Sequence, residues 1–279
     1  MARPRRPDRT SIGAVQHEVA RDMMVVRIGD MELEYVWAGD EKSDGRRLVF
    51  LHEGLGSAAL WKGFPDAVTR ATRTRALVYS RQGYGRSSVV RQPRTPDYMH
   101  REALEVLPRL LCELGIERPI LIGHSDGASI ALIHTASRPV TGLVLLAPHI
   151  FVEELSLASI RAARETYLAT DLPQRMARHH SDPDATFWGW NGIWLSDAFR
   201  DWNIEDCLSR IHCPVLVIQG RQDEYGTVAQ VDAIADQVAG PVETVLLDRC
   251  NHAPHLQQPA RTLSAAAAFV SSLVPSATR

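Results

Sequence analysis

The chain has few cysteines, and those it has form no recognisable pattern. Cys112, Cys207, Cys213 and Cys250 include no CxxC pair and have no histidines at metal-binding spacing. Structural zinc sites and disulfide frameworks both depend on such spacing. We therefore expect buried, reduced thiols, a cytoplasmic location and no bound metal.

The chain also lacks an excess of either charge and lacks long apolar runs. Its 31 lysines and arginines nearly balance 33 aspartates and glutamates, for a net charge of −2. A protein this close to neutral provides no basic field to displace counterions from a nucleic-acid backbone. Its longest apolar runs, such as residues 143–148, are far shorter than the roughly 20 residues that span a bilayer. We expect neither a nucleic-acid nor a membrane partner.

The N-terminal segment begins with basic residues but has no apolar stretch behind them. A secretory signal requires such a stretch. We therefore expect residues 1–22 to form a flexible arm in front of the folded part of the chain.

Eight short β-rich segments predict a mostly parallel sheet. Residues 23–28 and 31–37 flank Gly29-Asp30, which suits an antiparallel hairpin. The other six segments show no alternation, which is typical of strands buried on both faces; they are 48–51, 75–79, 119–122, 143–146, 214–218 and 242–247. A segment of helical period lies between two of them at 98–114, and an alanine-rich segment of helical composition follows the last strand at 262–270. The expected fold is α/β, an eight-stranded twisted sheet with helices on both faces and an N-terminal antiparallel hairpin.

Residues 150–210 interrupt this rhythm between the sixth and seventh strands. They contain no convincing strand but hold four of the six tryptophans, Trp188, Trp190, Trp194 and Trp202. We interpret them as a helical cap on a core formed by residues 23–149 and 211–279. The aromatic cluster is either the private core of this insertion or the lining of an apolar pocket. Trp188, Trp190 and Trp194 are the candidate substrate-binding residues.

The strongest chemical signal is Gly-His-Ser-Asp-Gly at 123–127, which follows a predicted strand and precedes a helical segment. A serine hydroxyl is a weak nucleophile unless a base removes its proton, and substrate must be able to reach it. Flanking glycines allow a tight turn in which Ser125 takes a strained backbone and projects above the sheet. Ser125 is therefore a candidate nucleophile.

In these segments the chain resembles the α/β-hydrolase family, over approximately residues 23–273. Residues 48–57 look like the family's strand and oxyanion loop, 214–224 like the strand and turn that carry the acid, and 250–255 like the histidine loop. The resemblance implies a Ser125–His252–Asp223 triad, in the order Ser, Asp, His along the chain. Glu224 is a possible substitute acid.

The resemblance also implies an oxyanion hole formed by the backbone N–H groups of Gly54 and Asp126. The side chain of Asp126 needs no role there, and we expect it to be exposed at the start of a helix. Two positions depart from the family pattern. Glu53 stands where glycine is frequent, and Ser80 stands where an aspartate commonly begins the next loop. Glu53 either reaches the pocket or, more simply, pairs with a nearby arginine. The arginines are expected on a solvated face; they are Arg81, Arg86, Arg91, Arg94 and Arg101.

The function that this resemblance implies is hydrolysis of a small or medium carboxylic ester through an acyl-enzyme. The same constellation also supports a C–C hydrolase of ring-cleavage diketones, an amidase or a thioesterase. A ligand-binding receptor on the same scaffold is a further alternative. The expected partner is a small acyl substrate, no cofactor is indicated, and the oligomeric state is open.

Overall fold

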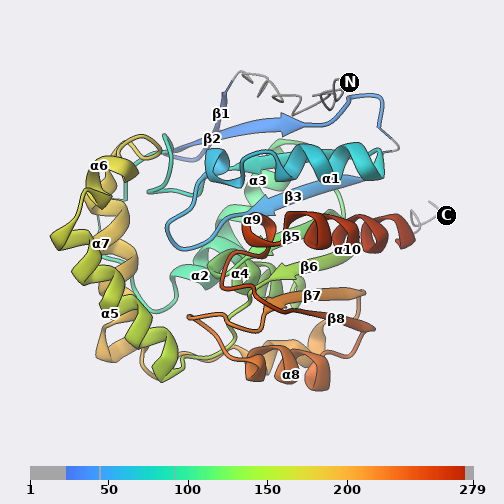
Figure 1. Ribbon diagram of the computed structural model, residues 1–279. Helices are drawn as coiled ribbons and strands as arrows, with labels where there is room; N and C mark the ends of the chain where they lie inside the picture. Colours follow the sequence, from blue (N-terminus) through green and yellow to red (C-terminus); the bar gives the residue numbers. More distant parts are fainter. Residues whose placement is uncertain (1–22, 44, 91, 274–279) are drawn as a thin grey trace, which may run out of the picture.

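An eight-stranded sheet runs through the computed structural model (Figure 1), which describes residues 23–273 apart from residues 44 and 91. The N-terminal arm expected over residues 1–22 lies outside these residues. The strands are β1 (Met24–Ile28), β2 (Met31–Ala38), β3 (Arg47–Leu51), β4 (Arg75–Tyr79), β5 (Ile120–His124), β6 (Gly142–Leu146), β7 (Val215–Gly220) and β8 (Val242–Leu247).

The strands lie in the order β1-β2-β4-β3-β5-β6-β7-β8. β1 pairs with β2 and β2 with β4 in antiparallel fashion, and every pairing from β4 to β8 is parallel. This confirms the expected mostly parallel sheet with an N-terminal antiparallel hairpin. The prediction for the last strand was wrong in one respect, because β8 is an edge strand and only its final residue, Leu247, is buried.

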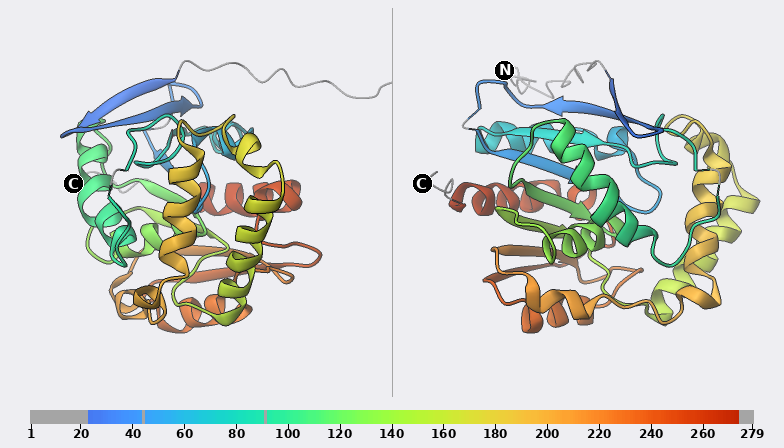
Figure 2. Two further views of the ribbon diagram at one scale, coloured as in Figure 1. Left: turned by 90° about the vertical axis from the view of Figure 1, so that its left-hand side faces the viewer. Right: turned by 180° about the vertical axis from the view of Figure 1, so that it is seen from behind.

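Helices cover both faces of the sheet (Figures 1 and 2). One face carries α1 (Phe64–Thr72) and α10 (Pro259–Ser272). The other face carries α2 (Tyr98–Arg101), α3 (Leu107–Glu113), α4 (Asp126–Thr135) and α8 (Val228–Gln237). The π turn η2 (Glu102–Val106) joins α2 to α3, and the short helices η1 (Ala58–Trp61) and α9 (Pro254–Gln257) lie in loops.

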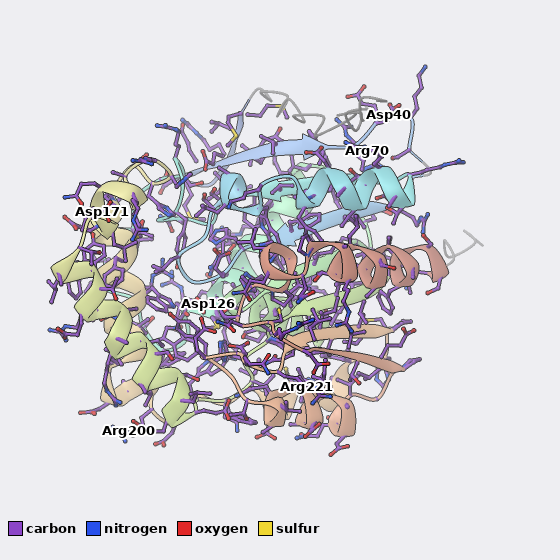
Figure 3. All side chains as sticks on the ribbon, in the orientation of Figure 1. Asp40, Arg70, Asp126, Asp171, Arg200 and Arg221 are labelled. Atoms are coloured by element: carbon purple, nitrogen blue, oxygen red, sulfur yellow. The ribbon has the colours of Figure 1, made fainter. Side chains whose placement is uncertain are left out.

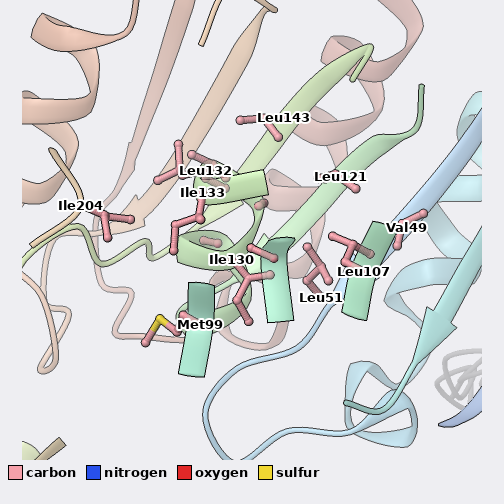
Figure 4. Close-up of a cluster of buried hydrophobic side chains, with 14 of the residues drawn as sticks. Val49, Leu51, Met99, Leu107, Leu121, Ile130, Leu132, Ile133, Leu143 and Ile204 are labelled. Carbon is pink, nitrogen blue, oxygen red and sulfur yellow. The ribbon is translucent and has the colours of Figure 1, made fainter. Parts of the chain in front are cut away.

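The sheet separates two hydrophobic cores, because successive residues of a strand point to opposite faces. In β3, Val49 and Leu51 pack in the core beneath α3 and α4 (Figure 4). Leu48 and Phe50 of the same strand pack in the core beneath α1 and α10. This double burial is the reason that the strand reads as an uninterrupted apolar run.

The insertion between β6 and β7 is helical, as expected. It contains α5 (Glu154–Ala169), α6 (Leu172–Met176), α7 (Pro183–Trp194), η3 (Asp197–Phe199) and η4 (Glu205–Arg210). Figure 2 shows α5 and α7 side by side at one end of the sheet. Helix α7 begins where Asp182 Oδ1 accepts the N–H of Ala185 at 2.9 Å, with Pro183 as the first helical residue.

All four cysteines are free thiols, but not all are buried. Cys207 and Cys250 are buried, Cys213 is half-buried, and Cys112 is exposed at the end of α3, contrary to the expectation. No helix in the part of the chain that the structure describes combines the length and hydropathy needed to cross a membrane.

Candidate active site

Ser125 occupies the sharp turn between β5 and α4. Its backbone lies at φ 52° and ψ −119°, outside the regions that side chains favour. The flanking glycines make the turn possible, because a Cβ on Gly123 would lie 2.4 Å from Gly127 O, and a Cβ on Gly127 would lie 1.9 Å from Leu51 O. The N–H of Ser125 donates to Leu146 O at 2.9 Å and fixes the turn against β6. Such a strained, fixed serine is typical of a functional position.

Asp223 and His252 meet in space although 29 residues separate them. His252 Nδ1 lies 2.9 and 3.0 Å from the two carboxylate oxygens of Asp223. The carboxylate also accepts the N–H groups of Tyr225 at 2.8 Å and Gly226 at 3.3 Å, and the amide of Gln219 at 3.2 Å. Burial alone would raise the pKa of Asp223, but the charge and hydrogen bond of His252 hold it below its ordinary value. Asp223 is therefore an ionised, immobile partner for the imidazole.

His252 lies beside the serine turn. Its imidazole centroid is 5.2 Å from that of His124, the residue before Ser125. His124 Nε2 donates to the carbonyl oxygen of His252 at 2.8 Å, which ties the two loops together. Among the described residues, Ser125 Oγ makes no hydrogen bond. Catalytic hydrogen bonds are often longer without substrate and tighten when it binds.

Glu224, the alternative acid, contacts the main chain instead of the imidazole. Its Oε2 accepts the backbone N–H of His252 at 3.2 Å. Asp223 is therefore the carboxylate that the structure pairs with the imidazole of His252.

The two candidate oxyanion donors lie on adjoining loops. The close approach of Gly127 to Leu51 O brings the start of α4 against the end of β3, and Gly54 follows that strand. The N–H of Asp126 opens α4, where the first backbone donors have no partner within the helix. Trp190 covers the Gly54 loop, since a Cβ on Gly54 would lie 2.2 Å from its Nε1.

The Asp126 side chain is buried, contrary to the expectation of an exposed position. It is 1% exposed, and Figure 3 labels it between the core and the cap. Its Oδ2 accepts the hydroxyl of Tyr98 at 2.7 Å, and that hydroxyl accepts Trp194 Nε1 at 3.1 Å. This chain of hydrogen bonds joins the serine turn to the cap.

Arg81 is also buried, whereas a solvated position was expected. It is 2% exposed and donates to the carbonyl oxygens of His52 at 3.1 Å and Glu53 at 2.9 Å. It lies 4.0 Å from Asp126 Oδ2, so that it links the Gly54 loop to the serine turn. Of the other arginines, Arg86 and Arg101 are exposed, Arg94 is half-buried, and Arg91 lies outside the described residues.

Glu53 pairs with a histidine and not with an arginine. Its Oε2 lies 3.5 Å from His124 Nδ1. Arg81 contacts only the main-chain oxygen of Glu53. The structure therefore places the unusual carboxylate directly beside the serine turn.

The three candidate tryptophans divide into two groups. Trp190 and Trp194 are buried, the first against Gly54 and the second 5.3 Å from the ring of His149. Trp188 is 37% exposed and packs on Tyr167. Residues two apart in a helix point in nearly opposite directions, whereas residues four apart share a face. This separates Trp188 from the site that the other two approach.

His149 is a site residue that the sequence analysis missed. It is 2% exposed, and its ring lies 5.5 Å from that of His252. Burial, followed by the charge of His252, lowers the pKa of His149 to about 3, so the ring is neutral at pH 7. Its position just after β6, beside the carboxyl ends of the neighbouring strands, is the signal that could have identified it.

Among the described residues, 23–43, 45–90 and 92–273, no group of three or more His, Cys, Asp or Glu side chains has the geometry to hold a metal ion.

Comparison with known proteins agrees with this architecture. The family model described as "Alpha/beta hydrolase family" matches residues 48–266. The sn-1-specific diacylglycerol lipase ABHD11 of Danio rerio is 29% identical over 144 residues, which cover 50% of this chain and 44% of that protein. The chain thus spans less than half the length of that relative.

Two longer matches cover most of the chain. Proline iminopeptidase of Lactobacillus delbrueckii subsp. bulgaricus is 22% identical over 262 residues, covering 79% of this chain and 88% of that protein. The solved structure of the enol-lactonase from Burkholderia xenovorans LB400 has a TM-score of 0.70 at 20% identity, covering 89% of this chain and 100% of that one. The likeness to the enol-lactonase shows a shared fold.

Proposed function

Because the chain belongs to the alpha/beta hydrolase family, we propose that it is a serine hydrolase that cleaves small or medium carboxylic esters through an acyl-enzyme on Ser125. One observation carries the proposal. The imidazole of His252 is hydrogen-bonded through Nδ1 to the carboxylate of Asp223, and it lies beside the strained turn of Ser125. Acyl transfer needs this combination of nucleophile, base and orienting carboxylate.

In the first half of the proposed reaction, Ser125 Oγ attacks the ester carbonyl while His252 Nε2 takes the hydroxyl proton. Asp223 accepts the hydrogen bond from Nδ1 and stabilises the imidazolium that forms. The tetrahedral intermediate then expels the alcohol, which receives the proton from His252, and the acyl group stays on Ser125. In the second half, His252 deprotonates a water that attacks the acyl-enzyme. The carboxylic acid leaves, and the proton returns to Ser125.

The backbone N–H groups of Gly54 and Asp126 are the proposed donors to the oxyanion of both tetrahedral intermediates. Preorganised donors matter because charge develops on the carbonyl oxygen only during the reaction. Arg81 supports this part, since it bonds the Gly54 loop and approaches Asp126 at the same time. We assign Arg81 the role of holding the two donors in register.

Substrate specificity belongs, in this proposal, to the face of α7 that lies over the site. Trp190 and Trp194 are the proposed substrate contacts, whereas Trp188 is not, for the geometric reason given above. The division into a core of residues 23–149 and 211–279 and a cap of residues 150–210 remains part of the proposal. A cytoplasmic location fits the four free thiols.

An amidase is the second candidate, because the relative that matches 79% of this chain is named an iminopeptidase. It uses the same residues and differs only in the bond that breaks. Ester hydrolysis is preferred because the diacylglycerol lipase, which is 29% identical over 144 residues, is named for a substrate that contains ester bonds.

The proposal is tested with the purified full-length chain and a panel of p-nitrophenyl esters of different acyl length. Matched p-nitroanilides, thioesters, lactones and a vinylogous diketone complete the panel. We expect ester turnover in the wild type and a fall in kcat of about 10⁴-fold or more in Ser125→Ala. Ser137→Ala, which changes an exposed serine after α4, is the matched control and should retain full activity.

Three results would decide against the ester proposal. Undiminished turnover in Ser125→Ala would remove the nucleophile. Selectivity for anilides, thioesters or the diketone by orders of magnitude would select one of the other bonds. Tight binding of a small molecule without turnover of any substrate would favour a receptor.

A further inference from the structure

Of the two ring nitrogens of His124, Nε2 donates a hydrogen bond, and Nδ1, which makes none within the described residues, lies beside a carboxylate. Nε2 lies 2.8 Å from the backbone carbonyl oxygen of His252, and Nδ1 lies 3.5 Å from a carboxylate oxygen of Glu53. A neutral imidazole carries one N–H, and its other nitrogen would direct a lone pair at an acceptor. The doubly protonated imidazolium satisfies the bond to His252 and carries the charge that Glu53 attracts, whereas a neutral ring can satisfy only one of these two contacts.

The Glu53 carboxylate is held close to the His124 ring, where it can neutralise a positive charge on that ring. Its carboxylate folds back over Gly56, where a Cβ would lie 2.3 Å from Oε2, so a side chain at 56 would displace it. The His124 side chain is only 4% exposed and that of Glu53 is 29% exposed. Burial by itself would lower the pKa of His124, but the Glu53 carboxylate raises it above the ordinary value. Burial opposes ionisation of Glu53, yet His124 holds its pKa well below the usual range.

The contact with His124 completes the fixation of His252. The imidazole of His252 is held by Asp223, and its backbone N–H by Glu224 at 3.2 Å. Its backbone carbonyl oxygen is held by His124. The residue that carries the proposed general base is therefore held at its side chain and at both backbone polar groups.

We propose that Glu53 and His124 form a second carboxylate–imidazole pair, which positions the backbone of His252 and the Gly54 loop for the reaction on Ser125. This inference rests on the proposed function. Glu53 precedes Gly54, His124 precedes Ser125, and the bond from His124 reaches His252. The pair thus connects the loops of the oxyanion donor, the nucleophile and the base, and both members act as positioning residues.

The proposal predicts a loss of kcat at alkaline pH. When His124 loses a proton, one of its nitrogens faces an acceptor without a hydrogen, so the link between the loops weakens. Four other titratable groups surround His124. They are His252 after β8, His255 in α9, Asp223 after β7 and His149 after β6.

Glu53→Gln tests the charge at nearly constant shape. Without the carboxylate, the pKa of His124 falls, and the glutamine amide can donate to a neutral ring. We expect the alkaline limb of kcat to shift to lower pH or to vanish. Glu102→Gln is the matched control, because Glu102 is a buried carboxylate that accepts from Tyr79 away from this pair. Its pH profile should match the wild type.

Two variants of His124 test the contact with His252. His124→Phe keeps an aromatic ring but removes the donor, and kcat should fall about 10- to 100-fold with KM changed less than about threefold. His124→Gln keeps a donor near the Nε2 position and should recover most of the lost kcat without an alkaline limb. Thermal unfolding of each variant confirms that the measured enzyme is folded.

Equal alkaline limbs in the wild type and Glu53→Gln would overturn the proposal. Wild-type kcat in His124→Phe would overturn it as well. The experiment separates this failure from that of the proposed function, because Ser125→Ala is measured in the same assay. If Ser125→Ala is inactive while the pair variants behave as the wild type, only the present inference is wrong.

Discussion

Buried polar side chains around Ser125 have charge states set by the few atoms that face them. Asp223 is kept ionised by His252, and His149 is kept neutral by burial. His255 follows the same rule as His149. Its ring lies 4.9 Å from that of Trp61, and burial, followed by the charge of His124, lowers its pKa to about 3.

His255 should make the free energy of unfolding depend on pH. The unfolded chain gains a proton on His255 as pH falls through about 6.5, whereas the folded chain gains none until about pH 3. Stability is therefore complete above about pH 6.5 and falls as pH decreases below it. His255→Phe should reduce this slope by up to about 1.4 kcal/mol per pH unit, and the remaining slope includes that of His149.

Urea unfolding between pH 4 and pH 8 measures this slope. His212→Phe changes an exposed histidine and controls for the effect of a histidine-to-phenylalanine substitution itself. Parallel pH curves for the wild type and His255→Phe would show that His255 is not kept neutral in the folded protein.

Buried polar residues whose partners lie far away in the chain are the part of the candidate site that the sequence could not predict. The burial of Asp126 depends on Tyr98, 28 residues away, and the pairing of Glu53 depends on His124. A local pattern reports only how a residue relates to its neighbours in the chain. Ser125, Asp223 and His252 were predictable because each follows a recognisable strand, although their catalytic roles remain a proposal.

At the scale of elements, the carboxyl ends of the strands position the candidate site residues. Ser125 follows β5, Gly54 follows β3, Asp223 follows β7, and His252 follows β8. The carboxyl ends of neighbouring parallel strands meet at one edge of a sheet, where ligands bind. Apolar runs predicted these strands well, because burial on two faces leaves a clear signal. The partial exposure of β8 was missed, because the sequence does not say which strand has a neighbour on one side only.

The loop after β3 provides a prediction at this scale. Gly54→Ala should lower kcat by about 10²- to 10³-fold, the usual effect of losing one oxyanion donor. The physical reason is that the added Cβ meets Trp190 at 2.2 Å and pushes the loop away from Asp126. Steady-state kinetics on the preferred ester measure the change, and Gly63→Ala, at an open position, is the control.

Trp190→Ala in the Gly54→Ala background removes the indole atoms that the new Cβ would meet. It should recover part of the lost kcat. An unchanged kcat in Gly54→Ala alone would argue against Gly54 as an oxyanion donor.

The whole molecule is organised by a hydrophobic core that continues from the sheet into the helical segment of residues 150–210, the proposed cap. Leu121 and Leu145 of the sheet belong to the same buried cluster as Phe187, Trp190 and Trp194 of the cap. The sequence analysis left open whether the aromatic residues form a private core or line a pocket. The structure shows that Trp190, Trp194 and Trp202 are buried in the core shared with the sheet, with Trp190 and Trp194 also at the candidate site, whereas Trp188 is 37% exposed.

This continuity predicts that the cap and the sheet unfold together. Four of the six tryptophans lie in residues 150–210, so fluorescence reports mainly on the cap, and far-ultraviolet circular dichroism reports on the whole chain. The two thermal transitions should coincide, as in two-state unfolding. A fluorescence transition several degrees below the dichroism transition would show a cap that opens independently.

The most direct test of the central claim is the site of covalent modification by a fluorophosphonate, measured by intact mass and peptide mapping of the folded chain. We expect one adduct per chain, located on Ser125, with loss of ester turnover in proportion to labelling. We expect no adduct in Ser125→Ala or in the denatured wild type. An adduct on another residue, or full labelling with undiminished turnover, would contradict it.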